Sequence, residues 1–208
     1  MKPPARDKRQ LILDSAIAVF ARTGYHGSRV SDIAREAGIA YGLVYHYFRN
    51  KEEILETIFQ ERWGGFLDAV EAIADSEGQV EDKLLSLAAL ILNAFRLRPD
   101  WVKVLVFEIQ RSPRFASPEQ LRAVGRLFQI IARILREGQA AGVLREDIDP
   151  DVACYLFVGG LDIVLTGRVL EVIRVTGGDA GAREYDLRVA RTVVEVFLNG
   201  LKRREERE

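Results

Sequence analysis

Apolar residues recur three and four positions apart along most of the chain, which is the spacing typical of amphipathic helices. Glycine or proline stands near the limits of most of these segments, where helices commonly end or begin. One stretch, residues 101–111, is ambiguous by its period, and we predict a helix there because no other segment offers a partner strand. The pattern predicts an all-α fold of about nine helices, at 7–23, 28–37, 41–48, 51–74, 80–97, 101–111, 118–141, 150–175 and 183–203.

The segment 24–51 contains two short predicted helices separated by Gly38, Ile39 and Ala40, which is the spacing of a helix-turn-helix. Gly38 suits a sharp turn because glycine adopts left-handed backbone conformations without steric cost. With the apolar residues of both helices facing inward, the second helix keeps an outward face of Tyr41, Gly42, Leu43, Tyr45 and His46. A helix of this kind fits the major groove of DNA, where base edges carry sequence information.

The charge of the chain is uneven. Residues 1–50 contain eight Lys or Arg and four Asp or Glu, although the whole chain has a formal net charge of -1. A basic head on a mildly acidic body favours a polyanion as the partner of the head. The composition, 48% hydrophobic and 29% charged, excludes a disordered or collagen-like chain. Because there is no apolar signal-peptide core and no run of about 18 apolar residues, we expect a cytoplasmic protein without a membrane segment.

Several stretches of this head together resemble the DNA-binding domain of TetR-family transcriptional regulators. They are residues 20–25, 30–38, 42–48 and 51–52. The sequence departs from the family pattern at Leu43, where Thr or Ser is usual, and at Arg29, where a small hydroxyl residue is common. The resemblance implies a three-helix DNA-binding domain at 1–50 and a helical ligand-binding and dimerisation domain at 51–208.

The resemblance also implies which residues contact double-stranded DNA. The expected contacts to phosphates or groove walls are Ser28, Arg29, Tyr45, Tyr47 and Lys51. The expected contacts to base edges are Tyr41, Gly42, Leu43 and His46. Ser28 is in addition expected to cap the first helix of the motif.

A homodimer is a further implication of the resemblance, and its two-fold symmetry would match a pseudo-palindromic operator. The last two long predicted helices support it, since each carries an apolar face that a single chain would have little left to cover. The expected dimer residues are Leu156, Gly160, Val193 and Phe197. The alternative is that both faces belong to the core of one chain.

The middle helices carry large apolar residues interleaved with arginines, which recognise phosphate in a planar, bidentate way. This pattern favours a long apolar ligand with an anionic head. Residues 107–112 and 135–144 are similar to those of FadR-like members of the TetR family, the acyl-CoA-responsive repressors of fatty-acid degradation. The similarity implies an acyl-CoA effector and no cofactor. The expected ligand-binding residues are Phe107, Arg111, Arg114, Phe115, Phe128, Phe157, Leu161 and Arg168.

Other functions stay open at this point. A TetR-type regulator of drug efflux or aromatic metabolism would bind a different apolar ligand, and a helical scaffold with a degenerate helix-turn-helix would lack steeply salt-dependent DNA binding. An enzyme is not expected, because His26 and His46 both lie in the head and no catalytic or metal-binding arrangement appears. The single cysteine, Cys154, lies in an apolar run and is expected to be buried.

Overall fold

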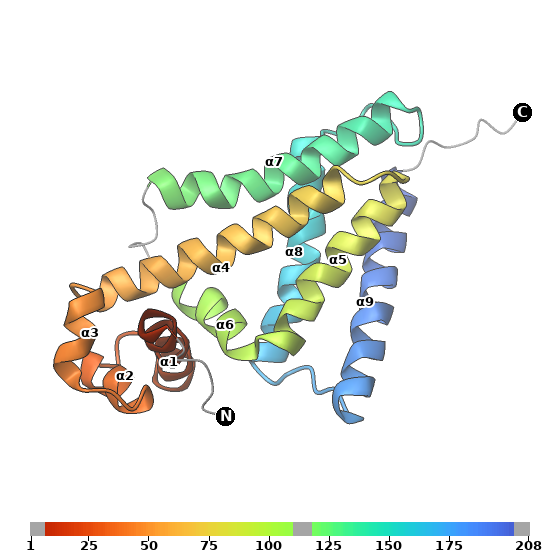
Figure 1. Cartoon of the computed structure of the whole chain (residues 1–208). Helices are drawn as coiled ribbons and strands as arrows, with labels where there is room; N and C mark the ends of the chain where they lie inside the picture. Colours follow the sequence, from red (N-terminus) through yellow and green to blue (C-terminus); the bar gives the residue numbers. More distant parts are fainter. Residues whose placement is uncertain (1–6, 110–117, 202–208) are drawn as a thin grey trace, which may run out of the picture. The chain divides into compact units, whose positions relative to one another are not determined.

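The computed structural model describes residues 7–109 and 118–201, and within these ranges the chain is built of α-helices with one π-helical segment (Figure 1). The elements are α1 (Lys8–Thr23), α2 (Val30–Glu36), α3 (Tyr41–Tyr47), α4 (Lys51–Ala74), α5 (Val80–Leu97), α6 (Pro99–Val104), η1 (Leu105–Ile109), α7 (Pro118–Ala140), α8 (Pro150–Val169) and α9 (Gly178–Leu201). The all-α prediction is confirmed, and apart from three segments the predicted limits agree with the observed ones to within two residues.

The chain forms two compact units. Of the described residues, those up to Gly65 belong to the first unit together with Pro99–Ile109, and 66–98 and 118–201 make up the second. The helix α4 runs without a break from the first unit into the second. The domain boundary expected at residue 50 stays a prediction.

The first unit packs α1, α2, α3 and the start of α4 around a small apolar core. Its fully or almost fully buried side chains include Ile12, Phe20, Ile33, Val44 and Ile54. The helix α6 belongs to the same unit and packs against α1. The helix predicted at 101–111 begins two residues earlier, at Pro99, because the missing N–H of a proline is tolerated in the first turn of a helix. At Leu105 the helix changes to the wider π-helical form.

The second unit is made of α5, α7, α8, α9 and the last part of α4. Figure 1 shows α5 beside α9 and α7 beside α8, and these are the most extensive contacts of the unit. Its core contains Leu84, Leu92, Ile131, Phe157 and Leu161, none of which is measurably exposed.

Two helix limits in this unit differ from the prediction. The helix α8 ends at Val169 rather than at residue 175, because Ile173 N–H turns back to bond the Gly167 carbonyl at 3.0 Å. A side chain at Gly167 would lie 2.8 Å from Ile173, so the absent side chain makes room for this turn. The helix α9 begins at Gly178, five residues before the predicted start at 183, so its first turn lies within the glycine-rich stretch 177–181.

Among the described residues, α8 is the one helix that is long and apolar enough to cross a membrane by length and composition. Helices in the core of a folded domain pass the same test, and α8 packs against both α7 and α9.

Candidate nucleic-acid interface

The turn between α2 and α3 has the geometry that the sequence predicts. Gly38 has φ of 65°, in the left-handed region that favours glycine. The Gly38 N–H bonds the Arg35 carbonyl at 3.2 Å and the Ile39 N–H bonds the Ala34 carbonyl at 3.0 Å, so the end of α2 is closed by backbone hydrogen bonds. Ala34 and Val44 are buried where the two helices meet. The helix-turn-helix is confirmed as a local structure.

The outward face of α3 carries two tyrosines that touch each other. Tyr41 and Tyr45 are 52% and 45% exposed, their hydroxyl oxygens lie 2.8 Å apart, and their rings meet edge to face with centroids 5.2 Å apart. The hydrogen bond with Tyr41 raises the pKa of Tyr45 above its ordinary value, with partial desolvation adding to the rise. The phenol of Tyr45 is therefore a neutral hydrogen-bonding group at physiological pH.

Gly42, the residue after Tyr41, is also exposed on α3. A side chain added at Gly42 would meet no atom within 4 Å, so packing within the chain does not require a glycine here. A glycine inside a helix is also destabilising relative to alanine. Both facts fit a position where another molecule approaches the backbone closely.

The other predicted base-edge and groove residues of α3 lie near this surface. His46 is exposed and Tyr47 is half-buried, with the two rings edge to face at 5.6 Å between centroids. Leu43 is also half-buried, so part of its side chain faces solvent where the family usually has a hydroxyl.

Ser28 occupies a different position from the one predicted. Its side chain is 4% exposed and its hydroxyl donates to the Tyr25 carbonyl at 2.7 Å. The N-cap of α2 is Arg29, whose backbone N–H donates to the Asp32 carboxylate at 2.9 Å. The prediction that Ser28 caps this helix is wrong, because its hydroxyl bonds back to the preceding turn. Arg29 itself is exposed.

The Lys51 side chain is held by the connection between α1 and α2. Its ammonium donates to the carbonyls of Tyr25 at 2.5 Å and Ser28 at 2.7 Å, and it lies 4.2 Å from the centre of the Tyr25 ring. These contacts join the start of α4 to residues 25–28 across more than twenty positions of sequence. Sequence reasoning missed this role, since nothing in the local pattern reveals the two carbonyl acceptors.

The expected ligand-binding residues are divided between the two units. Phe107 lies in η1 of the first unit and is 38% exposed, whereas Arg111, Arg114 and Phe115 lie outside the described residues. In the second unit, Phe157 and Leu161 are fully buried on α8, and the Phe128 ring lies 4.4 Å from that of Tyr155.

Arg168 is a buried residue with an internal partner. Its guanidinium donates to the Asp186 carboxylate and lies over the Phe95 ring at 4.6 Å from the centroid. Burial raises the pKa of Asp186, although the Arg168 charge pulls it down. The Oδ2 atom of Asp186 accepts no hydrogen bond within the described part of the chain. The expectation that Arg168 is available to an anionic ligand is not supported by this arrangement, since a carboxylate already occupies the guanidinium.

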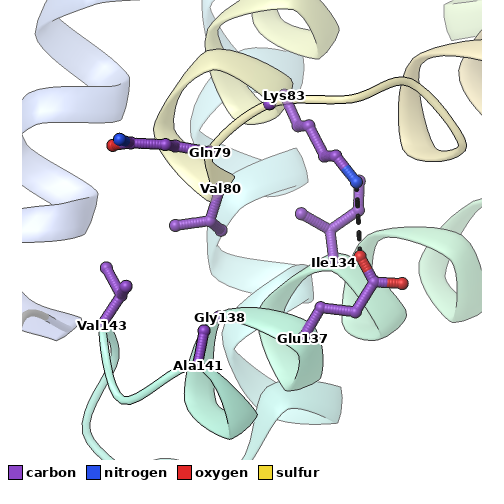
Figure 2. Close-up of a pocket in the computed structure, with 9 residues that line it drawn as sticks. Gln79, Val80, Lys83, Ile134, Glu137, Gly138, Ala141 and Val143 are labelled. Atoms are coloured by element: carbon purple, nitrogen blue, oxygen red, sulfur yellow. Dashed lines mark hydrogen bonds and ion pairs between the residues drawn. The ribbon is translucent and has the colours of Figure 1, made fainter.

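The second unit contains a pocket of about 330 Å³ where the start of α5 meets the end of α7 (Figure 2). The Lys83 ammonium lies at this pocket, donating to the Ala74 carbonyl at 2.7 Å and pairing with Glu137 at 3.3 Å. None of the expected ligand-binding residues lines it. The lining residues are Gly78, Gln79, Val80, Lys83, Ile134, Glu137, Gly138, Ala141 and Val143.

An apolar stripe runs along the exposed side of α8. Its members lie three or four positions apart and face the same side of the helix. They are Val152, Tyr155, Leu156, Gly159 and Ile163. Leu156 and Ile163 are 70% and 67% exposed, and Val196 on α9 is 69% exposed.

Of the four expected dimer residues, only Leu156 belongs to this stripe. Phe197 packs its ring against Phe157 of the same chain, at 5.3 Å between centroids. Gly160 faces Val193 of α9, whose Cγ1 would lie 3.9 Å from a side chain added at the glycine. These three residues thus contribute to the α8–α9 contact within one chain.

No group of three or more His, Cys, Asp or Glu side chains that could hold a metal occurs in the ranges 7–109 and 118–201. Cys154 is buried as expected, at 1% exposure, and its burial raises the pKa of the thiol. The thiol is therefore a poor nucleophile at neutral pH.

Comparison with known proteins gives two family matches that together span most of the chain. Residues 12–58 match the model described as bacterial regulatory proteins, tetR family, and residues 81–196 match the tetracyclin repressor-like C-terminal domain. The curated fatty acid metabolism regulator protein of Bacillus subtilis is 28% identical over 197 residues, covering 94% of this chain and 96% of that protein. The transcriptional repressor KstR2 of Mycobacterium tuberculosis is 32% identical over 158 residues, covering 73% and 76%.

A similar solved structure is that of the transcriptional regulator FadR from Bacillus subtilis in complex with stearoyl-CoA. Its TM-score is 0.74 at 28% identity, and the match covers 92% of this chain and 98% of that one. The matches to the N-terminal and C-terminal models agree with the helix-turn-helix and the helical second unit described above. The chain belongs to the TetR family of bacterial transcriptional regulators.

Proposed function

We propose that this protein is a transcriptional repressor that binds a pseudo-palindromic operator as a homodimer in the bacterial cytoplasm and is released by long-chain acyl-CoA. It would regulate transcription rather than catalyse a reaction. The observation that carries the DNA-binding part is the outward face of α3, which has two exposed tyrosines and an exposed glycine that the chain's own packing does not require.

DNA would meet this face with α3 in the major groove. The first residues of such a helix contact base edges, and Tyr41 is the first residue of α3. His46 and the exposed part of Leu43 lie along the same helix. Arg29 is an exposed cation at the N-cap of α2, where it would contact a DNA phosphate beside the helix-turn-helix.

The homodimer would form through the α8 stripe, with Val196 of α9 at the same interface. Large apolar side chains that are two-thirds exposed along three turns of a helix are costly in water, and a second copy of the chain would cover them. A two-fold dimer buries the same patch on both subunits. It would then place its two recognition helices on half-sites about one helical turn apart.

The proposed effector rests on similarity to the FadR that was solved with stearoyl-CoA. That similarity extends into the C-terminal domain, since the match covers 92% of this chain and 98% of that one. A ligand that favours a dimer with misplaced recognition helices lowers operator affinity, and by linkage the operator lowers ligand affinity by the same factor.

The experiment measures binding of the protein to a duplex that it selects from a random-sequence DNA pool. Fluorescence anisotropy is recorded alone, with stearoyl-CoA, and with free coenzyme A as the control for the head group. We expect stearoyl-CoA to release the duplex and coenzyme A to have no effect. Binding that stearoyl-CoA leaves unchanged would contradict the effector and favour a regulator of drug efflux or aromatic metabolism. Failure to select any duplex would favour the helical scaffold.

A further inference from the structure

The phenols of Tyr41 and Tyr45 can donate fewer hydrogen bonds to another molecule than their number suggests. Each phenol carries one hydrogen and can also accept. Since the hydroxyl oxygens of Tyr41 and Tyr45 lie 2.8 Å apart, one of the two hydrogens is used between them. The pair therefore has a single hydrogen left to donate outward, from whichever phenol accepts the internal bond.

We infer that Tyr41 and Tyr45 contact DNA as one unit, in which one phenol holds the other and the pair donates a single hydrogen bond to one acceptor of the duplex. This inference rests on the proposed function and specifies it. It replaces the separate roles expected from the sequence, with Tyr41 at a base edge and Tyr45 at a phosphate or groove contact. It makes Tyr41 and Tyr45 DNA-contacting residues that act together.

The geometry favours a unit over two independent contacts. The residues are four positions apart and so lie on one face of α3, where their rings also pack edge to face. Separate contacts would require breaking both the ring contact and the internal hydrogen bond. A pair that is already ordered before binding loses less conformational entropy when it meets DNA than two mobile phenols would.

The position of the pair indicates the kind of acceptor. Tyr41 begins α3, and the first residues of a recognition helix lie nearest the base edges. The open backbone at Gly42 permits close approach at this end of the helix. Major-groove acceptors such as guanine O6 and N7, adenine N7 and thymine O4 would suit the remaining hydrogen, and a phosphate oxygen offers the same chemistry.

A double-mutant cycle tests the inference with the duplex selected by the wild-type protein. Tyr41→Phe and Tyr45→Phe each leave the ring in place and remove one hydroxyl. We expect each to weaken binding by roughly three- to tenfold, the worth of one hydrogen bond, and the double variant to bind about as weakly as the worse single variant. Tyr185→Phe, which removes a phenol on α9, is the control and should keep wild-type affinity.

Losses that multiply in the double variant would overturn the single unit, because independent contacts add in free energy. Wild-type affinity in all three variants would also overturn it, since the pair would then not contact the duplex. A wild-type protein that selects no duplex would overturn the proposed function itself, and this is seen before any variant is made.

A second measurement tests the pair without DNA. Phenolate absorbance is recorded as pH rises, and the curve of a protein lacking the Tyr45 hydroxyl is subtracted from that of the matching protein that has it. The first pair is the wild type and Tyr45→Phe. The second pair is Tyr41→Phe and the double variant. Removing Tyr41's hydroxyl should lower the pKa of Tyr45 toward its ordinary value. An unchanged midpoint would overturn the pairing in solution whatever the DNA results are.

The acceptor is identified by repeating the DNA selection with Tyr41→Phe. We expect a loss of base preference at one position of each half-site, which would place the acceptor on a base edge. An unchanged selected sequence bound more weakly would also support a single acceptor and would identify it as a phosphate oxygen.

Discussion

The guanidinium of Arg168, near the end of α8, donates to the carboxylate of Asp186 on α9 in the interior of the second unit. The two side chains are only 6% and 7% exposed. The pair spans the connection between the two helices and is enclosed on one side by the ring of Phe95. Its first consequence is for stability, because removing one member leaves a buried charge without its partner.

Arg168→Ala should therefore lower the free energy of unfolding by about 3–5 kcal/mol, as measured by urea denaturation. Arg133→Ala is the matched control, because Arg133 forms an exposed ion pair with Asp75. Its loss should be at most about 1 kcal/mol. If the two variants lose equal stability, the buried pair does not have the structural role assigned to it.

The contribution of Asp186 to the free energy of unfolding should fall as pH rises. Burial raises the pKa of this carboxyl above the ordinary value of 3.8. The folded chain then keeps a proton that the unfolded chain has already released, so the contribution of Asp186 to stability falls as pH rises from 3.8 through the raised value. The stability of the wild type relative to Asp186→Asn should decrease over that interval. Urea unfolding of both proteins at several pH values checks this, and a relative increase would reverse the assigned sign.

Leu156→Glu should convert the dimer to a monomer. The change places a charge at the most exposed large side chain of the α8 stripe, on a surface that a second subunit would cover. Sedimentation velocity gives the mass of the particle. The control is Leu121→Glu, which places the same charge at an exposed leucine on α7, 59% exposed and outside the α8 stripe. A dimer that survives Leu156→Glu would argue against this stripe as the interface.

Gly42→Ala should separate DNA binding from folding. The added methyl group meets no atom within 4 Å in the chain, and alanine is the better helix former by about 1 kcal/mol, so thermal stability should hold or rise. Affinity for the selected duplex should fall, because the methyl group would stand where the duplex approaches. Gly125→Ala on α7, where a side chain also meets no neighbour, should gain stability and keep DNA affinity. Equal DNA affinity in the two variants would show that Gly42 does not lie at the DNA interface.

Local pattern was sufficient for much of the fold and for the helix-turn-helix. The helical period and the Gly38 turn act over a few residues, and the structure has both where they were predicted. The exposure of Tyr41 and Tyr45 follows from the same period. Their mutual hydrogen bond could also have been expected, since residues four apart on a helix are neighbours.

The helical period could not predict contacts between side chains that are distant in the sequence. The period shows that Phe197 lies on an apolar face, but not that Phe157 of the same chain covers it. Lys51 is a cation at a helix start, but its acceptors lie on residues 25 and 28. Arg168 was grouped with ligand-binding arginines because its acidic partner is eighteen positions away. In each case tertiary packing determines the role of the side chain.

The central claim is that the outward face of α3 binds a specific DNA sequence, and selection from a random duplex pool tests it most directly. The selection is run at low salt with the full chain, and the enriched sequences are then bound again at rising salt. The account predicts an enriched pseudo-palindrome with half-sites about one helical turn apart, whose affinity falls steeply as salt rises. A pool that stays random after repeated rounds would contradict the account.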